Sequence, residues 1–164
     1  MPFLGGKKNF TMSFQDNIRL GKTEELQQQI EADPALVNLR DAKGFPPIIL
    51  ATYFDQPAVA RLLLEKGAEV DGRDAAGNTA LMGVCFKGNI DITKMLIEKG
   101  ADVNARNSGG TTPLIFAAMF EQLEIIRLLL ENGADKTMRD AQGNSAYAYA
   151  QQKENKNLMA ILKE

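Results

Sequence analysis

The chain has 164 residues, of which 45% are hydrophobic and 24% charged, as in an ordinary soluble globular domain. Its formal net charge is −2, and its Lys and Arg are spread along the chain, so no concentrated basic face is available to bind nucleic acid. It has no histidine and one cysteine, Cys85, which excludes histidine-dependent catalysis, histidine-based metal sites and any intramolecular disulfide.

The sequence also bears on the compartment. No apolar run approaches the roughly 20 residues that span a bilayer, and the opening MPFLGGKKNF lacks the apolar stretch of a signal peptide. These features favour the cytoplasm and argue against membrane insertion. The alternative is a periplasmic or otherwise exported protein whose signal peptide has been removed.

The N-terminal quarter of the chain reads as an irregular segment and then a helix pair. Residues 1–12 are predicted to be irregular. Residues 13–40 contain SFQDNIRLG and TEELQQQIEA, two helical patterns with polar residues on the outward side. This pair is expected to form an N-terminal cap.

A repeated phrase organises the rest of the chain. EKGAEVDGRDAAGNTAL at 65, EKGADVNARNSGGTTPL at 98 and ENGADKTMRDAQGNSAY at 131 are near copies. The Asp or Asn that opens each unit recurs every 33 residues, at Asp41, Asp74, Asn107 and Asp140. A fixed period of this size is typical of stacked supersecondary units. The predicted repeats are 41–73, 74–106 and 107–139.

Each unit is predicted to contain a turn and two helices. In the second repeat, Gly77 is expected at positive φ in the opening loop, and Thr79 is expected to be the N-cap of the first helix. Gly88 then marks a tight turn into the second helix, which ends before Gly100. We call the loop that opens each unit a finger.

Residues 140–164 complete the array. They hold the last helix pair and are strongly polar in QQKENKN. Both ends are therefore expected to be capped, making 13–164 a single free-standing repeat domain.

The motifs resemble a known family. GTTPLIFAA and the later IIRLLLENGAD are similar to the ankyrin repeat, with its Thr-Pro-Leu entry and its Leu-Leu-Leu…Gly-Ala-Asp close. The resemblance covers 41–139 as three full repeats and extends weakly to 13–40 and 140–164. It implies an all-α solenoid of helix-turn-helix units with β-turn fingers. It also implies that a protein partner binds on the concave side.

Three of the departures from the family pattern bear on local structure. Pro46 replaces the Thr at the entry to the first full repeat, which removes a side-chain cap. Asp55 and Glu121 stand at the inter-helix position of Gly88, where positive φ costs a residue other than glycine about 1 kcal/mol. We favour a rearranged loop at these two positions. The alternative is that the two carboxylates have a functional role.

Candidate binding residues come from the concave face and the fingers. Large apolar groups recur there every 33 residues, which favours an interface, since aromatic residues often anchor partners. The ten residues expected to contact the partner are Lys43, Phe45, Tyr53, Phe54, Arg73, Phe86, Lys87, Arg106, Met119 and Phe120.

Two structural alternatives stand beside these assignments. Tyr53, Phe86 and Met119 could instead pack between neighbouring repeats. The finger arginines could form a structural ladder, with Arg73 paired to Asp71 or Asp74, in place of a row presented to an acidic partner.

The functional expectation is a non-enzymatic protein-binding module without cofactor or metal. We expect a monomer that inhibits a partner enzyme, in the manner of a self-protection (immunity-type) protein. The alternative is a passive adaptor, scaffold or chaperone-like holder. A small-molecule-binding or catalytic protein is a remote third possibility, because the sequence supplies no converging polar groups, and Cys85 is expected in the core.

Overall fold

The computed structural model describes residues 12–163; the predicted irregular segment 1–12 lies outside this range except for Met12. Within it the chain forms α-helices in pairs, together with one 3₁₀ helix, η1 (Pro34–Asn38). The helices are α1 (Phe14–Leu20), α2 (Thr23–Ala32), α3 (Pro47–Tyr53), α4 (Pro57–Glu65), α5 (Ala80–Lys87), α6 (Ile90–Glu98), α7 (Pro113–Met119), α8 (Leu123–Glu131), α9 (Ala146–Gln152) and α10 (Lys156–Leu162).

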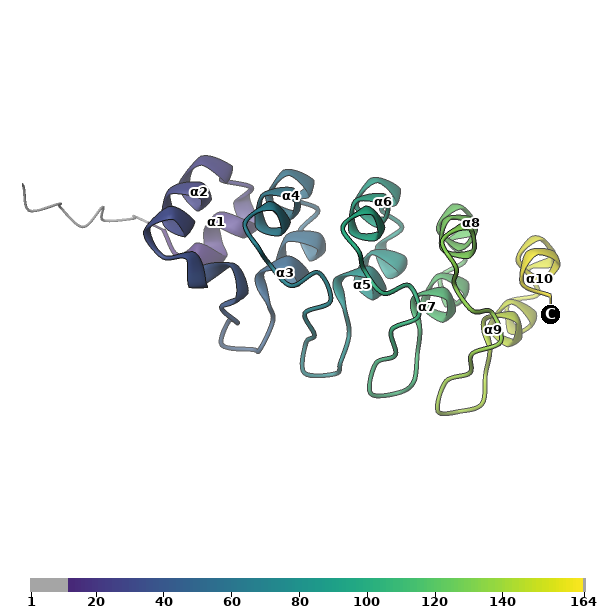
Figure 1. The fold of residues 1–164 in the computed structure, drawn as a ribbon. Coiled ribbons are helices and arrows are strands. Elements are labelled where there is room, and N and C mark those ends of the chain that lie inside the picture. The colour runs from purple at the N-terminus through teal and green to yellow at the C-terminus, as the bar shows by residue number, and fades with distance from the viewer. Residues whose placement is uncertain (1–11, 164) are drawn as a thin grey trace, which may run out of the picture.

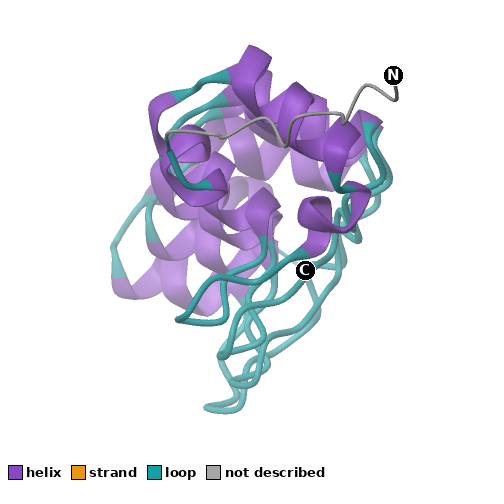
Figure 2. Cartoon of the chain, turned by 90° about the vertical axis from the view of Figure 1, so that its left-hand side faces the viewer, coloured by secondary structure: helices purple, strands orange, loops and turns teal. Residues whose placement is uncertain are grey.

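The pairs stack side by side into a solenoid with two helical layers (Figure 1). The first helices of the pairs, α1, α3, α5, α7 and α9, form an inner row, and the second helices form an outer row. Four fingers, residues 39–46, 72–79, 105–112 and 138–145, extend together from one side of the stack (Figure 2). The all-α solenoid expected from the sequence is thus observed.

The core lies between the two layers and repeats with the same period as the sequence. Val59, Ile92, Ile125 and Leu158 form one column of fully buried side chains on the outer helices. A second column consists of Leu63, Leu96, Leu129 and Leu162, each 0% exposed. Burial of one such side chain contributes about 1.5–3 kcal/mol, and no helix pair can bury its own column alone. Stacking is therefore what stabilises each unit.

Helix boundaries agree with the predicted signals. Gly77 has a φ of 77°, and the Thr79 hydroxyl caps α5 by accepting from the N–H of Met82. Gly88 (φ 80°) ends α5, and Gly100 (φ 90°) comes just after the end of α6. Pro46 stands at the N-cap of α3 and provides no side-chain cap, as its lack of a hydroxyl predicted.

The inter-helix turns correct one expectation. Asp55 (φ 52°) and Glu121 (φ 55°) adopt the same left-handed conformation as Gly88, so the favoured rearrangement of these loops is wrong. Asn89, the N-cap of α6, donates from Nδ2 to Asp55 Oδ1 over 3.4 Å. Asn155, the N-cap of α10, donates to Glu121 Oε1 over 2.9 Å. The two carboxylates therefore join their repeat to the next one.

No helix within residues 12–163 is both long enough and apolar enough to cross a membrane.

Candidate functional site

A groove of about 1020 Å³ runs along the concave side of the stack, between the inner helices and the fingers. It begins at α1 and reaches α7, so it covers the N-terminal part of the array. Its wall is formed by Ser13, Gln15, Asp16, Arg19, Arg40, Asp41, Ala42, Lys43, Phe45, Ile49, Leu50, Tyr53, Phe54, Asp74, Asn78, Thr79, Met82, Gly83, Phe86, Phe116 and Phe120.

Six of the ten residues predicted to contact a partner line this groove. They are Lys43, Phe45, Tyr53, Phe54, Phe86 and Phe120. The other four, Arg73, Lys87, Arg106 and Met119, do not line it. The structure therefore brings together the aromatic residues and the first finger, and it separates them from the finger arginines of the later repeats.

Four aromatic residues at the groove rim touch in two pairs, and three of them are exposed. Tyr53 is 60% exposed, Phe86 52% and Phe120 40%, so none of the three is buried between repeats. Phe86 and Phe120 meet edge to face, with ring centroids 4.6 Å apart. Tyr53 and Phe54 make the same kind of contact over 5.1 Å. We call these four residues the aromatic rim.

Phe54 and Met119 are less available than the other predicted apolar residues. The guanidinium of Arg19 lies over the Phe54 ring, 5.6 Å from its centroid, and Phe54 is half-buried. Met119 is also half-buried and packs against the core. Of the three residues that could have packed between neighbouring repeats, Met119 does so, whereas Tyr53 and Phe86 do not.

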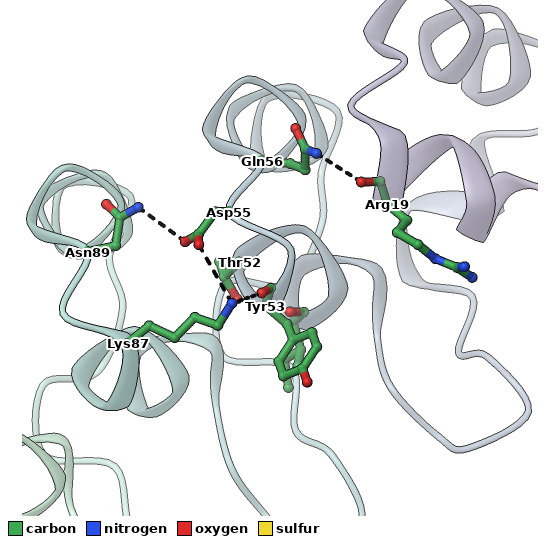
Figure 3. A network of polar contacts seen from close by, with 8 residues as sticks. Arg19, Thr52, Tyr53, Asp55, Gln56, Lys87 and Asn89 are labelled. Carbon is green, nitrogen blue, oxygen red and sulfur yellow. Dashed lines mark hydrogen bonds and ion pairs between the residues drawn. The ribbon is translucent and has the colours of Figure 1, made fainter. Parts of the chain in front are cut away.

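Lys87 is engaged within the chain. Its ammonium group donates to the Tyr53 carbonyl and lies 3.6 Å from Asp55 Oδ2 (Figure 3). It also lies 4.6 Å from the centre of the Tyr53 ring. Lys87 therefore joins α5 to the end of α3 and holds Tyr53 at the rim of the groove.

The finger arginines form a structural ladder, but their acceptors are carbonyls. Arg73 donates from Nη1 to the carbonyl of Gly77 in its own finger and to that of Arg106 in the next, over 2.9 and 2.8 Å. Arg40 contacts the Arg73 carbonyl in the same way, and Arg106 contacts that of Arg139. Among the described residues, Arg73 forms no ion pair with Asp71 or Asp74 within 4.0 Å. The pairing expected for Arg73 is therefore wrong.

Carboxylate or amide side chains shape every finger. Asp41 Oδ1 accepts from the N–H groups of Lys43 and Phe45, both over 2.9 Å, and Asp74, Asn107 and Asp140 do the same in their own fingers. The later finger tips are also joined by backbone bonds, from Ser108 N–H to the Ala76 carbonyl and from Ala141 N–H to the Gly109 carbonyl. Within residues 12–163, no such bond joins the first finger tip to the second. The first finger, which carries Lys43 and Phe45, is the least constrained.

The groove floor was not among the predicted contacts. Leu50, Gly83 and Phe116 lie one repeat apart and all line the groove, as do Ile49 and Met82. A signal for them is present, because the same 33-residue register that selects Tyr53 and Phe86 also places a row three residues earlier. The contribution of α1 through Asp16 and Arg19 has no such signal, since it depends on how the first helix pair stacks.

Ionisable groups outside the groove serve the fold. Burial raises the pKa of the Cys85 thiol far above its ordinary range, which agrees with its expected place in the core. Burial also raises the pKa of Asp140, but hydrogen bonds from the Tyr149 hydroxyl and from backbone N–H groups outweigh it and hold that pKa below its usual value. Over the described part of the chain, no group of three or more His, Cys, Asp or Glu side chains is placed to hold a metal ion.

Stacked helix pairs with projecting fingers and an apolar concave groove define a repeat protein built for contact with another macromolecule. Models of ankyrin repeats match the chain in three copies, over residues 18–107, 73–140 and 105–164. The chain belongs to the ankyrin-repeat family.

A curated relative lies in the same family. A stretch of 63 residues is 36% identical to NF-kappa-B inhibitor alpha of Sus scrofa. The match covers 38% of this chain and 20% of that protein, so the chain corresponds to about a fifth of its relative's length. Membership of the ankyrin-repeat family implies a protein-interaction module.

Proposed function

We propose that residues 13–164 act as one domain that binds a protein partner in the concave groove and inhibits it by covering its functional surface. The aromatic rim carries this proposal. Its exposed side chains lie on a rigid frame and face solvent, so core packing does not account for them. Aromatic residues of this kind supply much of the energy at protein interfaces.

The shape of the groove supports occlusion of a partner. The lining extends over three repeats and the first helix pair, a surface suited to one contiguous interface of about 800 Å² per partner. The relative that shares a 63-residue stretch with this chain is itself named as an inhibitor, NF-kappa-B inhibitor alpha. An enzyme is the proposed target, because covering a cleft is the simplest effect of a bound protein without catalytic groups of its own.

The first finger is proposed to complete the site. Lys43 is exposed and Phe45 half-buried, and both line the groove. Because no backbone bond within the described residues joins this finger tip to the next, it can adjust to the partner at a low cost. Arg73 and Arg106 are proposed to contact the partner only at the edge of the site. Their guanidinium groups already donate hydrogen bonds to carbonyls of the next finger.

The test compares capture of partners from the source organism by three forms of the protein. In the first variant, Phe54, Phe86 and Phe120 are replaced by alanine. In the control, Arg61, Lys94 and Arg127 are replaced by alanine; these exposed residues lie 33 apart on the outer helices. Circular dichroism checks that both variants keep native helicity.

We expect the wild type and the control to retain one partner that the groove variant loses. Loss of the partner's activity in a one-to-one complex supports inhibition. Ternary complexes with an active partner would instead favour an adaptor. Equal capture by all three forms would move the site away from the groove.

A further inference from the structure

One glycine of the groove has no structural reason to be glycine. Gly83 lies in the middle of α5, is exposed and lines the groove. Leu50 on α3 and Phe116 on α7 occupy the same position one repeat before and one repeat after, and both line the groove too. Because α5 packs between α3 and α7, Gly83 leaves open space in the row between Leu50 and Phe116, and we call this space the notch.

Neither conformation nor packing requires this glycine. Its φ is not positive, and a Cβ built on it would meet no other heavy atom within 4 Å. Every other glycine among residues 12–163 has either a positive φ or a neighbour within that distance. Glycine inside a helix is less favourable than alanine, so the fold is weakened here without a gain in packing.

The surroundings of the notch favour an uncharged apolar occupant. Leu50, Phe116 and Phe86 supply apolar surface around it. The charged groups of the groove are balanced, with three acidic and three basic residues: Asp16, Asp41, Asp74, Arg19, Arg40 and Lys43. All but Lys43 have hydrogen bonds or ion pairs from their side chains within the chain. A cationic group at the notch would therefore lose water without gaining a partner, and an anionic group would find only Lys43, which stands on the first finger.

We propose that the notch at Gly83 receives one large apolar side chain, aromatic or branched aliphatic, from the protein partner. The claim that this side chain belongs to a protein partner rests on the proposed function. The chemistry of the notch does not, because it depends only on the residues that surround it. A side chain inserted there would enter the groove floor in the row of Leu50 and Phe116, and large apolar side chains of this kind often act as anchors at protein interfaces.

The test uses N-acetyl-L-phenylalaninamide as a probe of the notch and N-acetylglycinamide as its control. Amide chemical shifts at Leu50, Gly83 and Phe116 are measured by NMR during titration. We expect saturable shifts with a Kd of about 1–10 mM, the range for a ligand of this size, and none with the control. The variant Gly83→Leu should weaken this binding at least tenfold by filling the notch. The variant Ala58→Leu, which adds the same side chain on the exposed face of α4, should leave it unchanged.

A milder variant guards against misfolding. Gly83→Ala should raise the melting temperature, since alanine favours the helix, while it weakens probe binding several-fold. Absence of saturable shifts in the wild type, or equal binding by Gly83→Leu, would overturn the proposal.

Partner binding separates the two proposals. If a captured partner is lost with the Phe54, Phe86 and Phe120 variant but bound equally by Gly83→Leu, the notch is wrong and the proposed function stands. If the probe binds the notch but no protein binds the groove, the proposed function fails, while the preference of the notch for an apolar side chain is retained.

Discussion

Glu121 accepts a hydrogen bond from Asn155 Nδ2 over 2.9 Å while its own backbone is held at a φ of 55°. The left-handed conformation costs Glu121 about 1 kcal/mol, and the hydrogen bond to the next repeat offsets it by about 0.5–1.5 kcal/mol. Asp55 and Asn89 repeat this relationship two repeats earlier. An acidic residue at the inter-helix turn is thus coupled to an asparagine cap in the next unit.

This coupling predicts the order of two substitutions. Glu121→Ala keeps the strained conformation and loses the hydrogen bond, so we expect it to destabilise the fold by about 0.5–1.5 kcal/mol. Glu121→Gly loses the bond but removes the strain, so its stability should lie close to that of the wild type. Urea denaturation measures both. A glycine variant no more stable than the alanine variant would contradict the coupling.

Two other inter-helix turns, at Gly21 and Gly88, use a different pair. Gly88 faces Gln122, which donates from Nε2 to the Phe86 carbonyl over 3.4 Å. A Cβ on Gly88 would lie 2.7 Å from Gln122 Oε1, so a side chain there displaces the glutamine. Gly21 and Gln56 repeat the arrangement, with Gln56 donating to the Arg19 carbonyl over 2.8 Å (Figure 3). At these four turns, Gly21 and Gly88 thus face glutamines, whereas Asp55 and Glu121 accept from asparagines.

Replacing the Gly88–Gln122 pair by an aspartate–asparagine pair tests whether the two positions are coupled. Gly88→Asp alone should destabilise the fold by at least about 1 kcal/mol, from strain and from the clash with Gln122. Gln122→Asn added to it should recover part of that loss, because the shorter amide can meet the new carboxylate as Asn89 meets Asp55. The double-mutant cycle should give a coupling of at least about 0.5 kcal/mol. Additive effects would refute the pairing.

Asp71 is a site where the fold is weaker than it could be. It accepts from the N–H of Asp102 with both oxygens, over 3.1 and 3.2 Å. Asn104, one repeat later, accepts from Asp135 N–H and also donates to the Gly133 carbonyl over 3.1 Å. Partial burial raises the pKa of Asp71, and the nearby Asp102 carboxylate raises it further. The ionised form is therefore disfavoured in the folded state.

We expect Asp71→Asn to stabilise the protein by about 0.5–1.5 kcal/mol at neutral pH, because an asparagine can donate where the carboxylate cannot. The sign of the pH dependence is set by the raised pKa. A carboxyl whose pKa is higher in the folded state lowers stability as the pH rises through that pKa. The advantage of the variant should therefore grow between about pH 3 and about pH 7. Melting curves across this range check it, and a variant that is less stable at neutral pH would contradict it.

Tyr149 ties the last finger to the last inner helix. Its hydroxyl donates to Asp140 Oδ2 over 2.5 Å, and Asp140 is buried. Tyr149→Phe should cost about 1.5–3 kcal/mol, the usual range for a hydrogen bond to a charged group. Because the pKa of Asp140 is lowered in the fold, its contribution is present at neutral pH and lost as the pH falls through that pKa. The wild type should therefore lose more stability than the variant on acidification, and parallel pH profiles would contradict this.

The repeat period explains why so much of the fold can be predicted from the sequence. Turns and helix caps depend on residues of one repeat alone, so they can be predicted from a single unit. Examples are Gly77, Thr79, Gly88 and Gly100. The Arg106 carbonyl that Arg73 contacts and the Asn89 that Asp55 contacts cannot be predicted in the same way, because each lies one unit further along the stack. Their contacts depend on how closely two units stack, which no local pattern encodes.

The groove is predictable only in part for a related reason. Register selects the rows of side chains that face the concave side, but small rotations of the helices decide exposure within a row. Tyr53 is consequently more exposed than Met119 in one row, and Phe120 is more exposed than Phe54 in the next. The register also places Gly83 in the row of Leu50 and Phe116, but the open space beside it is recognised only once its neighbours are placed.

Site-specific photocrosslinking tests the central claim most directly. p-Benzoylphenylalanine is introduced at position 86, in place of Phe86 on the aromatic rim, and separately at position 94, in place of Lys94 on the outer face of α6. We predict that a captured partner is crosslinked from position 86 and not from position 94. A partner crosslinked from position 94 alone would show that the concave groove is not the binding surface.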